Sequence, residues 1–583
     1  MTPASVTEPI SLLAGLDDDQ KVAAEALRGP VCILAGAGTG KTRAITHRIA
    51  YGVATGTYAA NRVMALTFTN RAAAELRGRL RHLGAGSVSA RTFHAAALSQ
   101  LNYFWPHTVG GTMPSLINSK GRMLGHAAER LRLKLDTATL RDIAAEIEWR
   151  KVSGLSVEQY AAAGRQPPQA LTVEQVAAMQ QAYEDLKDER KQLDFEDVLL
   201  ACAGMIETEP AVAMQVHEQY RFFVVDEYQD VSPLQQQLLD LWIGDRNDVC
   251  VVGDASQTIY SFAGAKSDYL LDFPSRHADA TVVRLEHNYR STPQIVDTAN
   301  RLMRGRMGAL TLQAHRTADA QPAPEITAYP HDHAEARAIA QSILQQIASG
   351  VKPENIAILY RINVQSAALE TALGDVGVPY LLRGSKRFFE LPEVRQAILT
   401  LRGASVSVTG EPLFKSVSDV LRSLGWTQTA PETAGAVRDK WESLNAIMGL
   451  VDTMPPGTTF RQFTDELLER QAGQHEPTVS AVTLATLHSA KGLEWDVVYL
   501  PGLSEGLVPI SYAKTFEQID EERRLLYVGI TRARSRLFLS WGEQPGRGSQ
   551  PRERSRFLTE IGIRNPGVAG ARRGSPSVSS RQS

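Results

Sequence analysis

Short apolar runs alternate with longer amphipathic stretches along most of this chain. Each run is apolar at consecutive positions, so both faces of the predicted strand would be buried. Stretches with apolar residues at helical spacing separate the runs, as in residues 41–50. This alternation predicts an α/β fold with doubly wound parallel sheets. The predicted strands are 31–34, 63–66, 222–225, 249–252, 356–359 and 497–500.

Two long segments interrupt the alternation. Residues 100–193 consist mostly of helix formers without strand runs, broken by a turn with Gly and Pro at 164–169. Residues 400–477 are also poor in strand runs and lie between two strand-bearing halves. We expect both segments to be mainly helical insertions. Residues 564–583 are rich in Arg, Gly, Ser and Pro and contain little that is apolar, which predicts a disordered tail.

Length, charge and cysteine content narrow the class of protein. A chain of 583 residues is too long for one core, so we expect several domains. The formal net charge is only -2, so any nucleic acid would bind in a local channel. The cysteines Cys32, Cys202 and Cys250 are far apart and predict reduced thiols without a metal site. The N-terminus lacks a signal pattern and no apolar run approaches the ~18 residues of a membrane span, which predicts a cytoplasmic protein.

A phosphate-binding loop is predicted at residues 35–42. The segment AGAGTGKT matches the phosphate-loop pattern except for Ala35 at its first glycine position, and it joins a predicted strand to a predicted helix. Backbone N–H groups would cradle the phosphates, Lys41 would reach the β- and γ-phosphates, and Thr42 would ligate Mg²⁺. The alternative is a glycine-rich turn that only bends the chain. The expected nucleotide contacts here are Ala35, Gly36, Ala37, Gly38, Thr39, Gly40, Lys41, Thr42 and Arg43.

Two acids follow the predicted strand 222–225. The carboxyl end of a buried strand is where α/β sheets bind ligands, so Asp226 would hold the magnesium ion and Glu227 would orient and deprotonate the attacking water. By itself, such a pair could equally be a solvated strand end. Phosphoryl transfer also needs cations, and Arg290 and Arg532 are candidates that spacing alone does not distinguish from surface arginines.

Further motifs follow one another along the chain: LDDDQ at 16–20, TFTNRAA at 67–73, TFH at 92–94, DFED at 194–197, VGDASQTIYSF at 252–262, LEHNYRS at 285–291, TLHSAKGLEW at 486–495 and ERRLLYVGITRA at 522–533. Taken in order, these motifs resemble those of UvrD/Rep/PcrA-type superfamily 1A DNA helicases over about residues 16–557. The second insertion is much shorter than the 2B domain of well-known members, and in this respect the chain resembles an actinobacterial UvrD-like branch.

The resemblance implies two RecA-like motor domains with ATP in the cleft between them. It also implies that Gln20 reads the adenine, Gln257 senses the γ-phosphate, Glu494 meets the ribose, and Arg290 and Arg532 close on ATP. The implied domains are 1–99 with 194–283 (1A), 100–193 (1B), 284–399 with 478–563 (2A), 400–477 (2B-like) and the tail 564–583.

A set of DNA-facing residues follows from the same resemblance. Bases stack on aromatic faces with about 1–3 kcal/mol each and little sequence preference, as a tracking motor requires. For Tyr260 and Phe262 the alternative is a place in the core. Ala263 stands where the family usually has arginine, and Phe262 where tryptophan is common, so one polar contact is missing. The expected DNA contacts are Phe68, Asn70, Thr92, His94, Phe195, Tyr260, Phe262, Arg361 and His488.

The function that we expect is an ATP-dependent single-stranded DNA translocase and 3′–5′ helicase in DNA repair or replication. Polarity and pathway come from the resemblance alone. The cofactors would be ATP and Mg²⁺, and the partners single-stranded DNA, single-strand/duplex junctions and repair or loading proteins. One alternative is a translocase that displaces proteins from DNA and unwinds duplex poorly. A helicase–nuclease is disfavoured. A DNA-binding module without ATP hydrolysis is also disfavoured, because the residues expected to hydrolyse ATP are all present in this chain.

Overall fold

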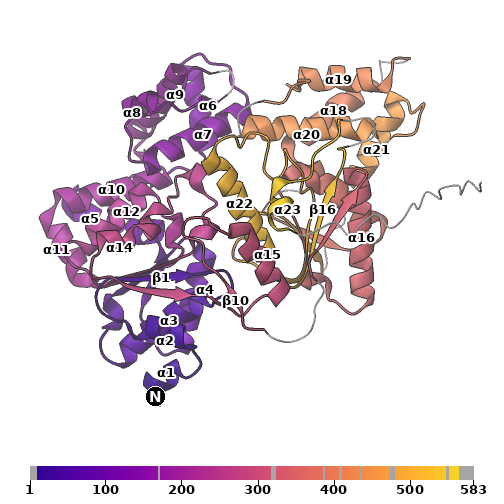
Figure 1. Cartoon of the computed structure of the whole chain (residues 1–583). Helices are drawn as coiled ribbons and strands as arrows, with labels where there is room; N and C mark the ends of the chain where they lie inside the picture. The colour runs from indigo at the N-terminus through magenta and orange to yellow at the C-terminus, as the bar shows by residue number, and fades with distance from the viewer. Residues whose placement is uncertain are drawn as a thin grey trace, which may run out of the picture.

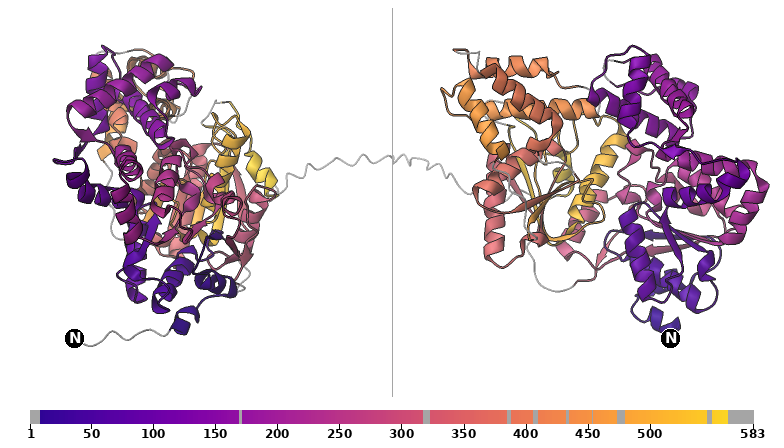
Figure 2. Two further views of the ribbon diagram at one scale, coloured as in Figure 1. Left: turned by 90° about the vertical axis from the view of Figure 1, so that its left-hand side faces the viewer. Right: turned by 180° about the vertical axis from the view of Figure 1, so that it is seen from behind.

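The computed structural model describes residues 9–168, 171–316, 323–384, 388–405, 410–431, 435–452, 454–472, 480–545 and 550–562. Figure 1 shows two α/β halves side by side, with two helical groups at one end of the molecule. The views in Figure 2 place both helical groups at that same end, opposite the N-terminal helix α1 (Pro9–Leu13). Among the described residues, no helix combines the length and apolar character that a bilayer span requires. The predicted tail 564–583 lies outside the described residues.

The first half contains a six-stranded parallel sheet in the order β3-β2-β6-β7-β1-β8. Its central strands are buried because helices cover both faces, as the consecutive apolar residues predicted. The strands are β1 (Val31–Ala35), β2 (Val63–Thr67), β3 (Ser89–Thr92), β6 (Phe222–Val225), β7 (Val249–Gly253) and β8 (Thr281–Leu285). One face packs against α1, α2 (Asp18–Glu25), α3 (Lys41–Ala54) and α4 (Asn70–His82). The other packs against α5 (Phe93–Thr108), α10 (Phe195–Thr208), α11 (Pro210–Gln219) and α12 (Pro233–Ile243).

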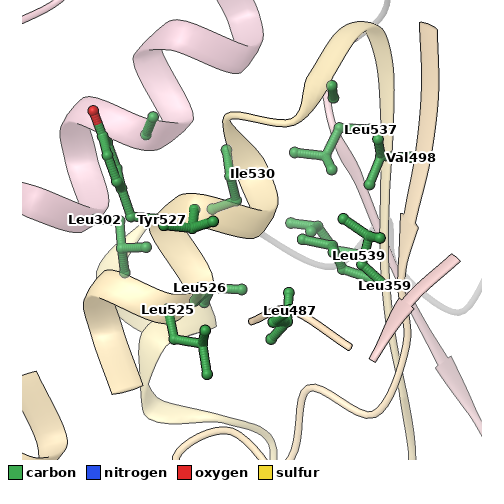
Figure 3. Close-up of a cluster of buried hydrophobic side chains, with 14 of the residues drawn as sticks. Leu302, Leu359, Leu487, Val498, Leu525, Leu526, Tyr527, Ile530, Leu537 and Leu539 are labelled. Carbon is green, nitrogen blue, oxygen red and sulfur yellow. The ribbon is translucent and has the colours of Figure 1, made fainter. Parts of the chain in front are cut away.

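The second half repeats this design with six parallel strands in the order β11-β16-β15-β12-β14-β13. Figure 3 shows part of its core, in which Leu525 and Ile530 of a covering helix belong to one buried cluster with Leu359 and Leu539 of the sheet. The strands are β11 (Glu325–Tyr329), β12 (Ile356–Tyr360), β13 (Tyr380–Arg383), β14 (Val482–Thr486), β15 (Trp495–Leu500) and β16 (Ala533–Gly542). The covering helices are α15 (Pro293–Met303), α22 (Phe516–Ile530) and α23 (Arg556–Glu560) on one face and α16 (Asp332–Ala348) and α17 (Ser366–Asp375) on the other.

The two insertions are mainly helical, as predicted, and each has its own apolar core. The first contains α6 (Lys120–Arg130), α7 (Thr137–Val152), α8 (Val157–Ala162) and α9 (Val173–Glu189). The second contains α18 (Pro392–Ser405), α19 (Leu413–Ser423), α20 (Ala436–Val451) and α21 (Phe460–Ala472).

Details of the first insertion differ from the expectation. It is closed by a two-stranded pair, β4 (Ser115–Leu116) with β5 (Gln192–Leu193), in a segment expected to have no strands. Residue 100 lies within α5, whose buried side chains belong to the core of the first sheet. Residue 400 lies within α18. Helical periodicity continues across both positions, so composition alone did not mark where one core ends and the next begins.

Candidate nucleotide and DNA sites

A cleft of about 590 Å³ lies between the two α/β halves. The first half contributes the turn after β1, and the second half contributes the segment before β15. Ala35, at the end of β1, and Gln20, on α2, are not among the cleft-lining residues. The expected nucleotide residues that do line the cleft are Gly36, Ala37, Gly38, Thr39, Gly40, Lys41, Thr42, Arg43, Asp226, Glu227, Gln257, Arg290, Glu494 and Arg532.

The glycine-rich turn has the conformation that a phosphate cradle requires. Gly38 and Gly40 have φ angles of 72° and 82°, which residues with a Cβ adopt only under strain. Gly40 precedes the first turn of α3, so the free N–H groups of that helix point into the cleft. Lys41 Nζ is buried and has no hydrogen-bond partner among the described residues. An ammonium group in this position fits an anionic ligand such as a phosphate.

The two acids after β6 have opposite electrostatic environments. Burial and the adjacent charge of Glu227 raise the pKa of Asp226 to about 7. Burial would also raise the pKa of Glu227, but the ammonium groups of Lys41 and Lys491 outweigh it and lower this pKa to about 2. Lys41 Nζ lies 3.7 Å from Glu227 Oε1. Glu227 is therefore an ionised carboxylate that could accept a proton, whereas Asp226 would need a nearby cation to stay ionised at neutral pH.

Arg532 from the second half reaches across the cleft to the first. Its Nη2 lies 3.4 Å from Gln257 Oε1, and the amide of Gln257 donates to Asp254 at 2.7 Å. Burial, followed by repulsion from Arg290, lowers the pKa of Arg532 to about 9. No carboxylate in the described part of the chain lies within ion-pair distance of Arg532. The guanidinium is still charged at neutral pH and is available to an anion in the cleft.

Arg290 and Glu494, both expected to contact nucleotide, pair with each other. Glu494 also accepts from Arg534 Nη2 at 2.5 Å. Arg290 Nη1 donates to the Thr531 carbonyl at 3.1 Å, which places it beside Arg532. A bound nucleotide would therefore have to compete with Glu494 for Arg290 or take the place of this ion pair.

Gln20 is fixed against the phosphate loop. Its side-chain amide donates to the Thr39 carbonyl at 2.9 Å, and its backbone N–H donates to Asp17 at 2.8 Å. Tyr289 of the second half donates its hydroxyl to the same Asp17. The sequence assigned no role to Tyr289, although it lies next to Arg290 in a matched motif and connects the second half to the helix that carries Gln20.

A second group of residues forms an aromatic surface that both halves share. Phe68 follows β2, Tyr260 and Phe262 follow β7, and His488 follows β14. The rings of Phe68 and Tyr260 are stacked at 5.7 Å, and His488 lies 6.0 Å from Phe262. Phe262 is 66% exposed, which rules out the core alternative for it, while Tyr260 is half-buried. Burial and the charges of Arg361 and Lys491 lower the pKa of His488 to about 3, so its ring is neutral.

The other expected DNA residues lie in different settings. Phe195 is 56% exposed, and its ring packs edge-on to His94 at 6.1 Å. Asn70 is the exposed first residue of α4. Thr92 caps α5, because its hydroxyl accepts from the Ala95 N–H at 3.2 Å.

Arg361 differs from these because its charge is already paired within the second half. Its Nη2 lies 2.7 Å from Glu522 Oε1, and both side chains are largely buried. The structure thus gives Arg361 a clear internal partner, and a direct DNA contact would require that pair to open.

Lys491 connects the two sites, although the sequence motifs predicted no role for it. Its Nζ donates to Asp230 Oδ2 at 2.5 Å and to the Gln257 carbonyl at 2.8 Å. The same nitrogen lies 3.9 Å from Glu227 and 5.1 Å from the Tyr260 ring centroid. The only sequence signal was its place within the segment 486–495.

Comparison with known proteins agrees with this geometry. Residues 16–278 match the UvrD/REP helicase N-terminal domain, and residues 283–429 and 427–544 match the UvrD-like helicase C-terminal domain. The chain therefore belongs to the UvrD-type superfamily 1 helicases.

Particular relatives place the chain within this family. It is 49% identical over 577 residues to the ATP-dependent DNA helicase UvrD2 of Mycobacterium tuberculosis, covering 94% of this chain and 82% of the relative. It is 29% identical to DNA helicase II of Escherichia coli over 91% of this chain and 85% of the relative. It is also 29% identical to the ATP-dependent DNA helicase PcrA of Leuconostoc citreum over 94% of this chain and 85% of the relative.

Proposed function

We propose that the protein is an ATP-dependent motor that translocates along single-stranded DNA in the 3′–5′ direction and separates duplex DNA. The observation that carries this proposal is a physical connection between the two sites. Residues 254–262 run from the nucleotide cleft to the aromatic surface, and Lys491 of the other half contacts both. A change in the cleft that moves the two halves would therefore also move the rings on which bases stack.

The hydrolytic roles follow from the charges in the cleft. Lys41 would bind the β- and γ-phosphates, and the ionised Glu227 would accept the proton of the attacking water. Arg290 and Arg532 would stabilise the charge that develops on the transferred phosphoryl group. Because these arginines belong to the second half and Lys41 to the first, neither half would hydrolyse ATP alone.

Magnesium fits two of the oxygen donors that line the cleft. The Thr42 hydroxyl and the Asp226 carboxylate are hard oxygen donors, which Mg²⁺ prefers, with phosphate oxygens and water completing its coordination. The raised pKa of Asp226 supports this assignment, because a carboxylate buried beside Glu227 is poorly stabilised without a cation. When bound, the ion would neutralise phosphate charge.

DNA would lie across the aromatic surface, where both halves can grip it. Phe68, Tyr260 and Phe262 offer ring faces that bind any base, and neutral His488 can stack or form a hydrogen bond without adding charge. The proposed partners are single-stranded DNA, its junctions with duplex, and repair or loading proteins. Repair or replication in the cytoplasm is the setting that we propose.

A second candidate is a translocase that displaces proteins from DNA and unwinds poorly. The compact second insertion favours it, because its described part consists of four helices around one small core. Strand separation and displacement of a bound protein can be measured on the same tailed duplex. Efficient opening of bare duplex without a partner would remove the reason for this candidate.

The first test is the ATPase rate with and without single-stranded DNA, for wild type and Glu227→Gln. Strong stimulation by DNA that is lost in the variant is the expected result. An ATPase that does not respond to DNA would contradict the proposed motor, unless a loading partner restores the response.

A further inference from the structure

Two lysines of the first helical insertion are buried among acids, two of which lie on either side of Phe195 in the chain. Lys151, in the last turn of α7, is 2% exposed, and Lys187, near the end of α9, is 3% exposed. The acids are Asp194 and Asp197, at the start of α10, together with Glu184. Lysines are rarely buried this deeply unless they are paired. Neither lysine lines the nucleotide cleft.

The ion pairs fix the backbone on both sides of Phe195. Asp194 and Asp197 form a capping box in which each carboxylate accepts from the other residue's N–H at 2.9 Å. Lys151 Nζ lies 2.8 Å from Asp194 and 2.6 Å from Asp197. Lys187 pairs with the second oxygen of Asp197. The lysines allow two carboxylates to remain charged and close together, because burial would otherwise favour their neutral forms.

The start of a helix does not by itself require these buried charges. Helices α12 and α22 begin with uncharged capping boxes, Ser232 with Gln235 and Thr515 with Gln518. Burying charges is costly, and a buried ion pair adds little stability compared with apolar packing. The extra charges at α10 therefore point to a requirement for orientation rather than for stability.

The last turn of α7 contacts the segments that carry both groups of aromatic residues expected to bind DNA. On one side Lys151 holds the segment with Phe195, whose exposed ring packs edge-on to His94. On the other side Val152 closely approaches the turn that follows Phe262: a Cβ added to Gly264 would lie 2.6 Å from Val152 Cγ2. A helix of the insertion thus braces ring-bearing segments that belong to the first sheet.

We propose that Lys151 and Lys187 are positioning residues for DNA binding, which hold the first turn of α10 so that the ring of Phe195 faces a base. This proposal rests on the proposed DNA-binding function and on the DNA contact that the sequence motifs predict for Phe195. Loss of either ammonium leaves Asp194 and Asp197 underneutralised, and their repulsion loosens the first turn of α10. The nucleotide cleft stays intact because none of these residues lines it.

The test is a titration of oligo(dT) against the ATPase rate of full-length Lys151→Met and Lys187→Met. The oligo(dT) concentration for half-maximal stimulation should rise about tenfold, the size expected for one lost stacking contact, while the rates without DNA and at saturating DNA remain near wild type. Arg130→Met is the matched control, because it removes the exposed Arg130–Glu189 pair of the same insertion, at 2.7 Å, and should leave the titration unchanged. An unchanged half-maximal concentration in both lysine variants overturns the proposal, as does an equal shift in the control.

A double-mutant cycle separates positioning from a general loss of structure. If Lys151 acts through Phe195, then Lys151→Met combined with Phe195→Ala should shift the titration no further than Phe195→Ala alone. Additive shifts would overturn the positioning role. If Phe195→Ala leaves the titration unchanged while DNA still stimulates hydrolysis, the motor proposal survives and the role of Phe195, with this inference, fails. Lys187→Met, which leaves Lys151 in place, supplies the same cycle if Lys151→Met does not fold.

Discussion

The nucleotide cleft and the aromatic surface are built by the same two α/β halves according to different rules. In the cleft, the first half contributes Lys41 and two acids, and the second half contributes arginines, so charged side chains of both signs line one cavity. On the aromatic surface, Phe68 and Phe262 are 43% and 66% exposed and lie against other rings. Chemistry on one phosphate needs fixed charges, whereas tracking along DNA needs contacts that accept any base. Substitutions in the cleft should therefore lower the ATPase rate, and substitutions on the aromatic surface should lower the affinity for DNA.

The largest effect should come from the cleft residues of the first half. Lys41→Ala removes the ammonium that meets the phosphates, and Glu227→Gln removes the proton acceptor. Each should reduce DNA-stimulated hydrolysis about a thousandfold or more, measured by steady-state phosphate release. Binding of single-stranded DNA, followed by fluorescence anisotropy, should be retained in both. Turnover at the wild-type rate would refute the assigned roles.

A somewhat smaller effect should follow from Arg532→Ala. This change removes a buried cation from the second half, so we expect the turnover number to fall about a hundredfold to a thousandfold. Arg534→Ala is the control, since Arg534 is 40% exposed and pairs with Glu494 at the cleft rim. An equal loss of activity in both variants would mean that removing either arginine disturbs the cleft, and that Arg532 has no specific role in hydrolysis.

On the aromatic surface, Phe262→Ala should weaken DNA binding without changing the rate at saturation. One lost stacking contact corresponds to about a tenfold higher half-maximal DNA concentration. Tyr103→Ala provides the comparison, because this ring is 64% exposed on α5 but lies outside the surface of Phe68, Tyr260, Phe262 and His488. A lower ATPase rate of Phe262→Ala at saturating DNA would contradict the assignment of hydrolysis to the cleft and of DNA affinity to the aromatic surface.

The smallest expected effect is an increase in DNA affinity. Ala263 is exposed beside Phe262, so Ala263→Arg can be accommodated and adds a cation near the DNA backbone. DNA affinity should increase about two- to fivefold at low salt, and the gain should shrink as salt rises, because phosphate contacts release counterions. Ala263→Gln, with a long side chain but no charge, should show no salt-dependent gain.

The strands β1, β2, β6, β7, β12 and β15 were predictable because each contains a run of four apolar residues. All six predicted strands are present, including β6 and β12, which are completely buried. The edge strands were not predicted, and neither were the inner strands β14 and β16, in which polar residues interrupt the apolar ones. Strands β3 and β13 contain polar and partly exposed residues, since an edge strand is covered less completely than a central one. A run of consecutive apolar residues therefore identifies a strand that is buried on both faces, and this pattern misses strands that contain polar residues.

For the candidate site, the sequence motifs predicted many of the residues that line the cleft, although Ala35 and Gln20 do not line it, and the motifs could not predict the partners of these residues. Arg290 and Glu494 were both expected to contact nucleotide, and the structure pairs them with each other. Arg361 was expected near DNA, and the structure pairs it with Glu522. Each pair joins segments far apart in the chain, so no local pattern reports it.

The sequence by itself determined the α/β class, the phosphate loop at 35–42, the acids Asp226 and Glu227, and the kinds of side chain available for each task. These features depend on neighbouring residues and are written in local order. Only the tertiary structure decided that Lys491 meets Asp230, 261 positions away, and that Lys151 of an insertion braces Phe195. Such contacts arise when separate cores dock, and docking depends on the shapes of whole surfaces, which local patterns along the chain do not encode.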